Sequence, residues 1–162
     1  MVSLRIAVLF LSLMVLSGCA DHGTSPAGSV TSLGVDLNGE QVTLEQYRGR
    51  VVVANFWTTW VLPCQKQLAS LDSLQAEYPT GVAVIAVNFG EPADSVLQYL
   101  EGHPVNLRVT LDSGAAMRAL TNSHVFPTSL VFTPQGRLHG DIRGSGSLAN
   151  LEAVVLAAGG QP

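Results

Sequence analysis

The sequence predicts an α/β fold in which helices cover a mixed β-sheet. Two features of the chain carry this prediction. β-branched apolar runs, which suit buried strands, alternate with segments whose apolar residues recur at helical spacing, and this order indicates parallel strands joined by helical crossovers. Near the C-terminus, two strands follow each other with only a turn between them, which indicates an antiparallel edge of the same sheet.

The first elements are a hairpin, a buried strand and a helix. Apolar residues alternate with small or polar ones on both sides of Asn38-Gly39, and an Asn-Gly pair in that setting is a strong hairpin signal. The β-branched run from Val51 to Phe56 predicts a strand that is buried on both faces. Pro63 to Tyr78 has leucines at helical spacing and ends before Pro79, so it predicts a helix.

The remaining elements continue the alternation of strands and helices. In chain order they are a strand over 82–89, a helix over 92–102, a strand over 107–111, a helical stretch to about 120, strands over 128–132 and 137–142, and a helix over 148–158. We find no internal repeat and no second linker, so residues 31–162 are predicted to form a single domain.

Composition excludes several classes of protein. The chain has 162 residues, of which 47% are hydrophobic and 12% are charged, which is typical of one globular domain. The formal net charge is −4 and Lys66 is the only lysine, so no basic patch is available to bind nucleic acid. The histidines are scattered without metal-ligand spacing, and we therefore expect neither a metal nor another cofactor.

Residues 1–18 have the form of a signal peptide. One basic residue, Arg5, precedes an apolar run from Ile6 to Leu16 that is short for a permanent membrane-spanning helix. The following Ser17-Gly18-Cys19 completes a segment that resembles the lipobox of bacterial lipoproteins, in which the cysteine is acylated and becomes the new N-terminus. The alternative is an ordinary signal peptide, or an uncleaved anchor, with an incidental cysteine.

The lipobox interpretation predicts where the protein resides. Residues 19–30 would comprise the lipidated Cys19 and a flexible tether, because the segment is small, polar and contains glycine, serine and proline. The lipid on Cys19 would hold the domain on a membrane of the bacterial cell envelope, facing the periplasm. Ala20, in place of an aspartate, favours the outer membrane. Cys64 would then be the only thiol of the mature protein.

The segment from Ala54 to Cys64, ANFWTTWVLPC, resembles the redox-site segment of the thioredoxin superfamily. It is most similar to the membrane-anchored thiol–disulfide oxidoreductases of the TlpA/ResA type. The resemblance includes the preceding segment from Leu44 to Arg50 and the later Val125 to Thr128, so it covers almost the whole folded part. It implies a thioredoxin fold, here with an N-terminal β-hairpin.

The redox motif of that family is incomplete in this chain. The family carries Trp-Cys-x-x-Cys where a strand leads into a helix: the first cysteine is activated at the helix N-terminus, and the second resolves the mixed disulfide. Val61 stands at the first cysteine position and Cys64 at the second. Valine cannot attack a disulfide, and with Cys19 acylated the mature protein has a single thiol, so two-cysteine catalysis is excluded within one chain.

Two further departures lie on the helix that follows. Close relatives carry a glutamate, thought to assist proton transfer, where this chain has Gln67, and a proline where it has Ala69. An amide cannot act as a general acid or base. Loss of the nucleophile together with the proton carrier indicates relaxed redox function. For Gln67 taken alone, the alternative is a solvated helix residue.

Pro127 resembles the cis-proline that faces the redox site in this superfamily. In the family, the backbone just before that proline pairs with an extended substrate peptide, and Phe126 would supply those groups here. The alternative is a trans proline that opens a strand.

Three functions are therefore open. The first hypothesis is a redox-inactive module that binds an extracytoplasmic peptide or protein, of unknown identity, by strand addition. Its apolar groove would consist of Trp60, Val61, Leu62, Pro63, Phe126 and Pro127. The second is a monothiol oxidoreductase or peroxidase in which Cys64 is the catalytic residue and an external thiol resolves it. The third is a cross-link between two copies through Cys64.

Overall fold

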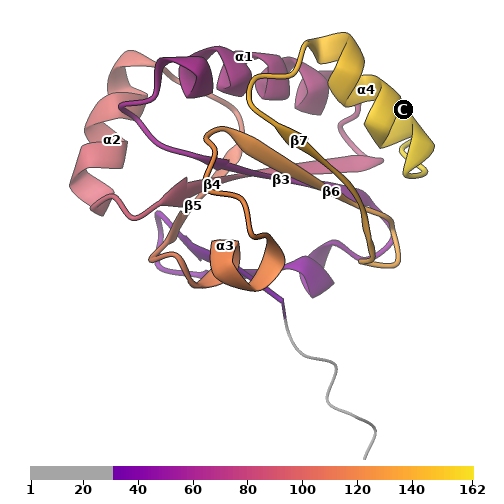
Figure 1. Ribbon diagram of the computed structural model, residues 1–162, viewed down its shortest axis with the longest axis horizontal. Helices are drawn as coiled ribbons and strands as arrows, with labels where there is room; N and C mark the ends of the chain where they lie inside the picture. The colour runs from indigo at the N-terminus through magenta and orange to yellow at the C-terminus, as the bar shows by residue number, and fades with distance from the viewer. Residues whose placement is uncertain (1–30) are drawn as a thin grey trace, which may run out of the picture.

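The computed structural model describes residues 31–162 (Figure 1). The predicted signal peptide, Cys19 and the tether lie outside the described residues. The elements are β1 (Ser32–Asp36), β2 (Gln41–Thr43), the 3-10 helix η1 (Leu44–Tyr47), β3 (Val51–Trp57), α1 (Leu62–Glu77), β4 (Val82–Phe89), α2 (Ala93–Gly102), β5 (Arg108–Asp112), α3 (Ala115–Leu120), β6 (Thr128–Phe132), β7 (Leu138–Arg143) and α4 (Leu148–Ala157).

All seven strands form one mixed sheet in the order β2-β1-β5-β4-β3-β6-β7. The three central strands β5, β4 and β3 run parallel to one another, and every other neighbouring pair is antiparallel. This confirms the predicted mixed sheet, including the antiparallel pair β6–β7 near the C-terminus. The hairpin β1–β2 extends the opposite side of the sheet by pairing β1 with β5, a contact that local sequence patterns do not indicate.

Helices cover both faces of the sheet. Helices α1, α2 and α4 lie on one face, and α3 lies on the other with η1 (Figure 1). The side chains of β3 alternate between two hydrophobic cores, one on each face of the sheet. Val53 packs in the core beneath α1 and α4, and Phe56 packs in the core beside α3. All seven residues of β3 are buried, as expected for a central strand between two layers of helices.

One glycine is required where the hairpin joins the sheet. Gly34 has φ +96°, and a Cβ there would lie 2.5 Å from the carbonyl oxygen of Leu111 on β5. The pairing of β1 with β2 also shifts register between Ser32 and Val35, as at a β-bulge. The left-handed backbone and the close approach of β5 both exclude a side chain at this position.

The predicted elements are present with ends that differ by one or two residues, and η1 is additional. Across residues 31–162, no helix is both long and apolar enough to cross a membrane.

Candidate functional site

The site lies where β3 passes into α1. Val61 is the N-cap residue of α1 and has an extended backbone, with φ −93° and ψ 106°. Its carbonyl oxygen accepts a hydrogen bond of 2.9 Å from the backbone N–H of Cys64. The half-buried Val61 side chain packs against the core beneath α1 and α4. A hydrocarbon therefore occupies the helix N-terminus at which a thiolate would be stabilised.

Cys64 lies in the first turn of α1 and points into the core. Its side chain is 0% exposed, and it is the free cysteine of the described part of the chain. Burial raises the pKa of the Cys64 thiol, hydrogen bonding by Thr58 opposes that rise, and the negative charge of Glu91 adds to it. Burial is the largest of these effects, so the pKa of the thiol lies above its ordinary value. Cys64 is thus a buried thiol whose environment disfavours the thiolate.

Glu91 is a residue of this site that the sequence analysis did not identify. From the loop between β4 and α2, its carboxylate accepts hydrogen bonds from the Thr59 backbone N–H (2.7 Å), the Thr59 hydroxyl (2.6 Å) and the Asn88 side-chain amide (2.6 Å). These bonds fasten the segment between β3 and α1. The position of Glu91 in the sequence could have indicated this role. Because β3 and β4 are parallel neighbours, the residues that follow both strands meet at one edge of the sheet.

Gln67 has a structural role on the inner face of α1. The residue is 1% exposed, so the alternative of a solvated helix residue is wrong. Its side-chain carbonyl accepts a hydrogen bond of 2.8 Å from the backbone N–H of Gly146, while its Nε2 has no partner. The amide links α1 to the loop that precedes α4, and it offers no ionisable proton to Cys64.

The loop over residues 144–146 joins the two halves of the predicted site. The backbone N–H of Gly144 donates to the carbonyl of Pro127 (2.8 Å), and the hydroxyl of Ser145 donates to the carbonyl of Pro63 (3.0 Å). With the bond from Gly146 to Gln67, this loop holds the start of α1 near the segment before β6. Residues more than sixty positions apart in the sequence are thus brought together, as the resemblance implied.

The peptide bond between Phe126 and Pro127 is cis, which confirms the prediction and excludes the trans alternative. The Thr128 hydroxyl donates to the Val125 carbonyl at 2.7 Å, and the Ser123 hydroxyl accepts from the Val125 N–H at 3.1 Å. No hydrogen bond joins the backbone N–H or carbonyl of Phe126 to any other part of residues 31–162. The segment is therefore fixed on both sides of a residue whose backbone groups are free to pair.

The six residues of the predicted groove differ in exposure. Trp60 is 73% exposed and Leu62 is 63% exposed. Pro63 is also exposed, Val61 and Phe126 are half-buried, and Pro127 is buried. Val61 and Phe126 pack against the core that contains Trp57, which is fully buried with its ring 5.5 Å from that of Tyr99. The surface at the start of α1 is therefore apolar and open to solvent.

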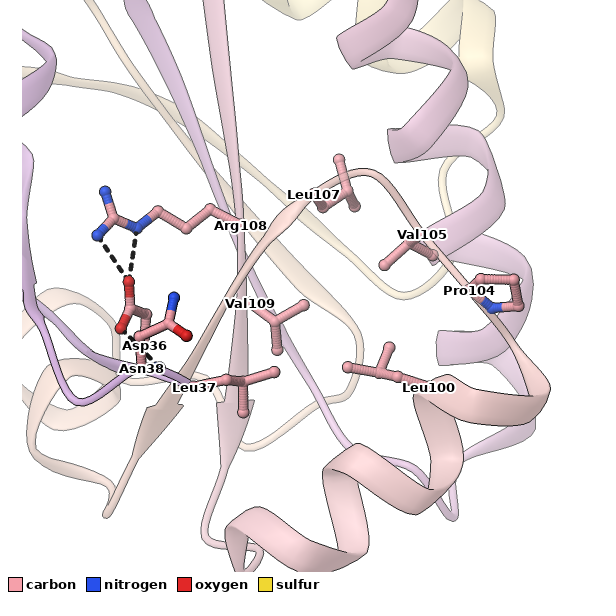
Figure 2. Close-up of a pocket in the computed structure, with 9 residues that line it drawn as sticks. All are labelled: Asp36, Leu37, Asn38, Leu100, Pro104, Val105, Leu107, Arg108 and Val109. Atoms are coloured by element: carbon pink, nitrogen blue, oxygen red, sulfur yellow. Dashed lines mark hydrogen bonds and ion pairs between the residues drawn. The ribbon is translucent and has the colours of Figure 1, made fainter.

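A separate cavity of about 340 Å³ lies beside β5 and α2 (Figure 2). Leu37, Leu100 and Val109 point into it (Figure 2). At its edge, the guanidinium of Arg108 pairs with Asp36 at 2.7 Å and with Glu40 at 3.0 Å. The guanidinium is paired with two carboxylates, so it is not an unpaired cation that would attract an anionic ligand. No group of three histidine, cysteine, aspartate or glutamate side chains in residues 31–162 could hold a metal ion.

Comparisons with known proteins agree with this geometry. The AhpC/TSA family matches residues 25–140. Thiol-disulfide oxidoreductase ResA of Bacillus subtilis is 30% identical over 104 residues, which cover 64% of this chain and 58% of that protein. ResA of Geobacillus kaustophilus is 30% identical over 118 residues, which cover 72% and 68% of the two chains. A thiol:disulfide interchange protein of the thioredoxin family from Chlorobium tepidum has the same fold, with a TM-score of 0.71, 23% identity, and coverage of 80% of this chain and 92% of that one.

The sheet order, the strand-to-helix junction with a buried thiol, and the cis-proline near it define a thioredoxin-fold protein in which one of the two redox cysteines is replaced. The chain belongs to the AhpC/TSA family and is a ResA-like member of the thioredoxin superfamily. It spans 58% of the length of the Bacillus subtilis relative.

Proposed function

We propose that this chain is a redox-inactive member of a disulfide reductase family that binds an extended peptide or protein segment in the bacterial cell envelope. The observation that carries the proposal is the unpaired backbone of Phe126 beside the cis bond to Pro127. The N–H and carbonyl of Phe126, two residues before β6 begins, offer the pairing groups of a strand edge. An incoming chain binds such an edge by strand addition, without covalent chemistry.

The exposed apolar side chains support the same proposal. Trp60 and Leu62 flank Val61, where the family's nucleophile would form the mixed disulfide. Covering large apolar side chains is favourable by about 25 cal/mol per Å² of buried area. A bound segment would therefore be held by hydrophobic contacts at the start of α1 and by backbone pairing at Phe126.

The lipid anchor forms part of this proposal. An acyl chain on Cys19 would hold the domain on the membrane, facing the periplasm, with residues 20–30 as a spacer. Metabolic labelling with palmitate tests this directly. We expect label on the parent protein and none on the Cys19→Ala variant. Equal labelling of both would contradict the anchor.

The redox part of the proposal is tested by reduction of insulin with dithiothreitol as the electron source. We expect no catalysis by the parent chain and measurable catalysis by Val61→Cys, which completes a Cys-x-x-Cys pair with Cys64. Catalysis by the parent that disappears in Cys64→Ala would overturn the redox-inactive assignment.

The binding part is tested with reduced, carboxymethylated α-lactalbumin, a permanently unfolded chain without free thiols. In the ¹⁵N spectrum of the labelled full chain, the indole resonance of Trp60 should shift on titration. Cys64→Ser should leave the dissociation constant unchanged, and Trp60→Ala should raise it. A large loss of binding in Cys64→Ser would contradict a non-covalent mode.

One observation favours the monothiol alternative: Thr58, close to Cys64 in the first turn of α1, opposes the rise in the pKa of that thiol. In that scheme, the Cys64 thiolate would attack a peroxide oxygen to give a sulfenic acid and hydroxide. Two external thiols would then reduce it to the thiol, with release of a disulfide and water. Slow peroxide turnover abolished by Cys64→Ala would support it.

The cross-linked dimer has no supporting contact, because the sulfur of Cys64 is fully buried. The test is a non-reducing gel of the Cys19→Ala protein, with Cys64 present and with Cys64 replaced by alanine. A monomer band in both lanes would exclude the cross-linked dimer.

A further inference from the structure

A second cavity adjoins Phe126 on the side of α3. It has a volume of about 180 Å³ and is lined by Phe89, Met117, Arg118, Thr121, Ser123, His124 and Phe126. Phe126 belongs to both places: its backbone lies beside the cis bond to Pro127, and its side chain forms one wall of this cavity. Its ring lies 5.2 Å from that of Phe89, at the end of β4.

The hydroxyl side chains within this lining, those of Thr121 and Ser123, are already paired. The Thr121 hydroxyl accepts from the Ser123 N–H (3.0 Å), and the Ser123 hydroxyl bonds to the Thr128 hydroxyl (3.0 Å) and accepts from the Val125 N–H (3.1 Å). The apolar walls are the two phenylalanine rings and the thioether of Met117. The interior therefore suits an apolar group that makes no demand for hydrogen bonds. Its volume is well below the roughly 300–1,000 Å³ of pockets for drug-sized ligands, and it fits a single side chain.

Two side chains of the lining, Arg118 and His124, can donate hydrogen bonds to an anion. Arg118 and His124 are exposed, and no aspartate or glutamate lines the cavity. The ion pairs within residues 31–162 involve Arg108 and Arg143, so Arg118 has no carboxylate partner there. In a chain of net charge −4, an unpaired arginine beside a histidine is a local positive site. It is complementary to a carboxylate on whatever fills the cavity.

Phe126 relates the cavity to the backbone that would pair with a peptide, because it contributes to both. Residues directly opposite each other in a β-ladder place their side chains on the same face of the sheet. A peptide residue that pairs with Phe126 would thus project its side chain alongside the Phe126 ring, towards the cavity. Neighbouring residues of the peptide would pass Arg118 and His124 at the opening.

We propose that this cavity is a specificity pocket for an extended peptide in which one aromatic or large aliphatic residue is flanked by acidic residues. The apolar side chain fills the space between Phe89, Met117 and Phe126, and a flanking carboxylate contacts Arg118 or His124. This inference rests on the proposed function, because it assumes an extended peptide paired with Phe126, and it adds the class of sequence that is selected.

Met117 provides a reporter inside the pocket. The chain contains three methionines, and Met117 is the one within residues 31–162. We would label the full chain with [¹³C-methyl]methionine and ¹⁵N-tryptophan and titrate it with acetyl-Glu-Phe-Glu-amide. The Met117 methyl and Trp60 indole resonances should both shift and saturate together. Acetyl-Gln-Phe-Gln-amide and acetyl-Glu-Ala-Glu-amide, which lack the charge and the ring respectively, should bind more weakly.

Arg118→Gln should raise the dissociation constant of acetyl-Glu-Phe-Glu-amide about 2- to 5-fold, the range of an exposed ion pair. The matched control is Arg137→Gln, an exposed arginine in the turn before β7, which should change nothing. A shift of Trp60 without Met117 would overturn the pocket and leave the proposed function standing. Equal affinity for the Glu and Gln peptides would overturn the acidic requirement. Absence of both shifts would count against the pocket and the peptide-binding function alike.

Discussion

The side-chain carbonyl of Gln67 accepts a hydrogen bond of 2.8 Å from the backbone N–H of Gly146. One residue thus connects helix α1 to the loop that also bonds Pro63 and Pro127. At the position where close relatives are expected to carry a proton-transferring glutamate, this chain has an amide with a structural role. The site retains its architecture while the groups that would carry redox chemistry are changed.

Gln67→Ala should lower the free energy of unfolding by about 1–3 kcal/mol, because it removes a buried hydrogen bond. It should also speed hydrogen exchange at the Gly146 amide. Urea unfolding and amide exchange measure the two effects. Gln98→Ala, on the exposed side of α2, is the control and should change stability by less than about 0.5 kcal/mol. Unchanged protection of Gly146 would show that the bond is not formed in solution.

Cys64 should react slowly with iodoacetamide at neutral pH. Because burial raises the pKa of the Cys64 thiol, the apparent pKa from the rate should exceed the free-thiol value of about 8.5. The experiment uses the Cys19→Ala chain, so that a single thiol is followed, and unfolding in urea should restore an ordinary rate. An apparent pKa well below the free-thiol value would instead move monothiol chemistry to first place.

Glu91→Gln should lower the pKa of the Cys64 thiol, since it removes a negative charge that disfavours the thiolate. The ultraviolet absorbance of the thiolate against pH, taken as the difference from Cys64→Ala, measures the shift. The comparison is Glu101→Gln, an exposed residue of α2, which should leave the titration unchanged. If the two variants titrated alike, Glu91 would exert no electrostatic effect on the sulfur.

Arg108→Gln should make the protein more sensitive to acid. The backbone N–H of Glu40 and the guanidinium of Arg108 hold the pKa of Asp36 below its ordinary value. Asp36 therefore contributes stability that is present above the unfolded value of about 3.9 and is lost as the pH falls through the lower folded value.

Without Arg108, the pKa of Asp36 in the folded protein rises towards its value in the unfolded chain. The midpoint of acid unfolding, followed by circular dichroism, should therefore move to higher pH. The control is Arg143→Gln, whose ion pair with Asp141 is much more exposed, and it should have little effect. Equal shifts in both variants would mean that the Asp36 pair has no special role.

Much of the fold could be predicted from local patterns. The valines of the run from Val51 to Phe56 favour a buried strand, and the run forms the central strand β3. The Asn38-Gly39 turn likewise indicates the hairpin without reference to the rest of the chain. The likeness of ANFWTTWVLPC to a known redox segment predicted the strand-to-helix junction, and VFPT predicted the cis bond. The lipid anchor and the groove as a binding site stay predictions.

The roles of Gln67 and Glu91 could not be predicted in the same way. Gln67 is a polar residue of a helix by sequence, and only its contact with Gly146 shows that it is buried. Glu91 is an acidic residue in a loop until the parallel pairing of β3 and β4 brings it to Thr59. The unpaired backbone of Phe126 is likewise visible only once every neighbouring hydrogen bond is assigned.

The sequence by itself determined which elements form and that the Cys-x-x-Cys motif lacks its first cysteine, because backbone propensity, apolar spacing and the identity of residue 61 are local properties. The tertiary structure decided that Cys64 is buried, with the pKa of its thiol raised, and that Gln67 bonds α1 to the loop before α4. It also decided that Phe126 has an unpaired backbone and lines an apolar cavity. Burial, pKa and hydrogen-bond satisfaction depend on residues distant in the chain, and folding alone brings those residues into contact.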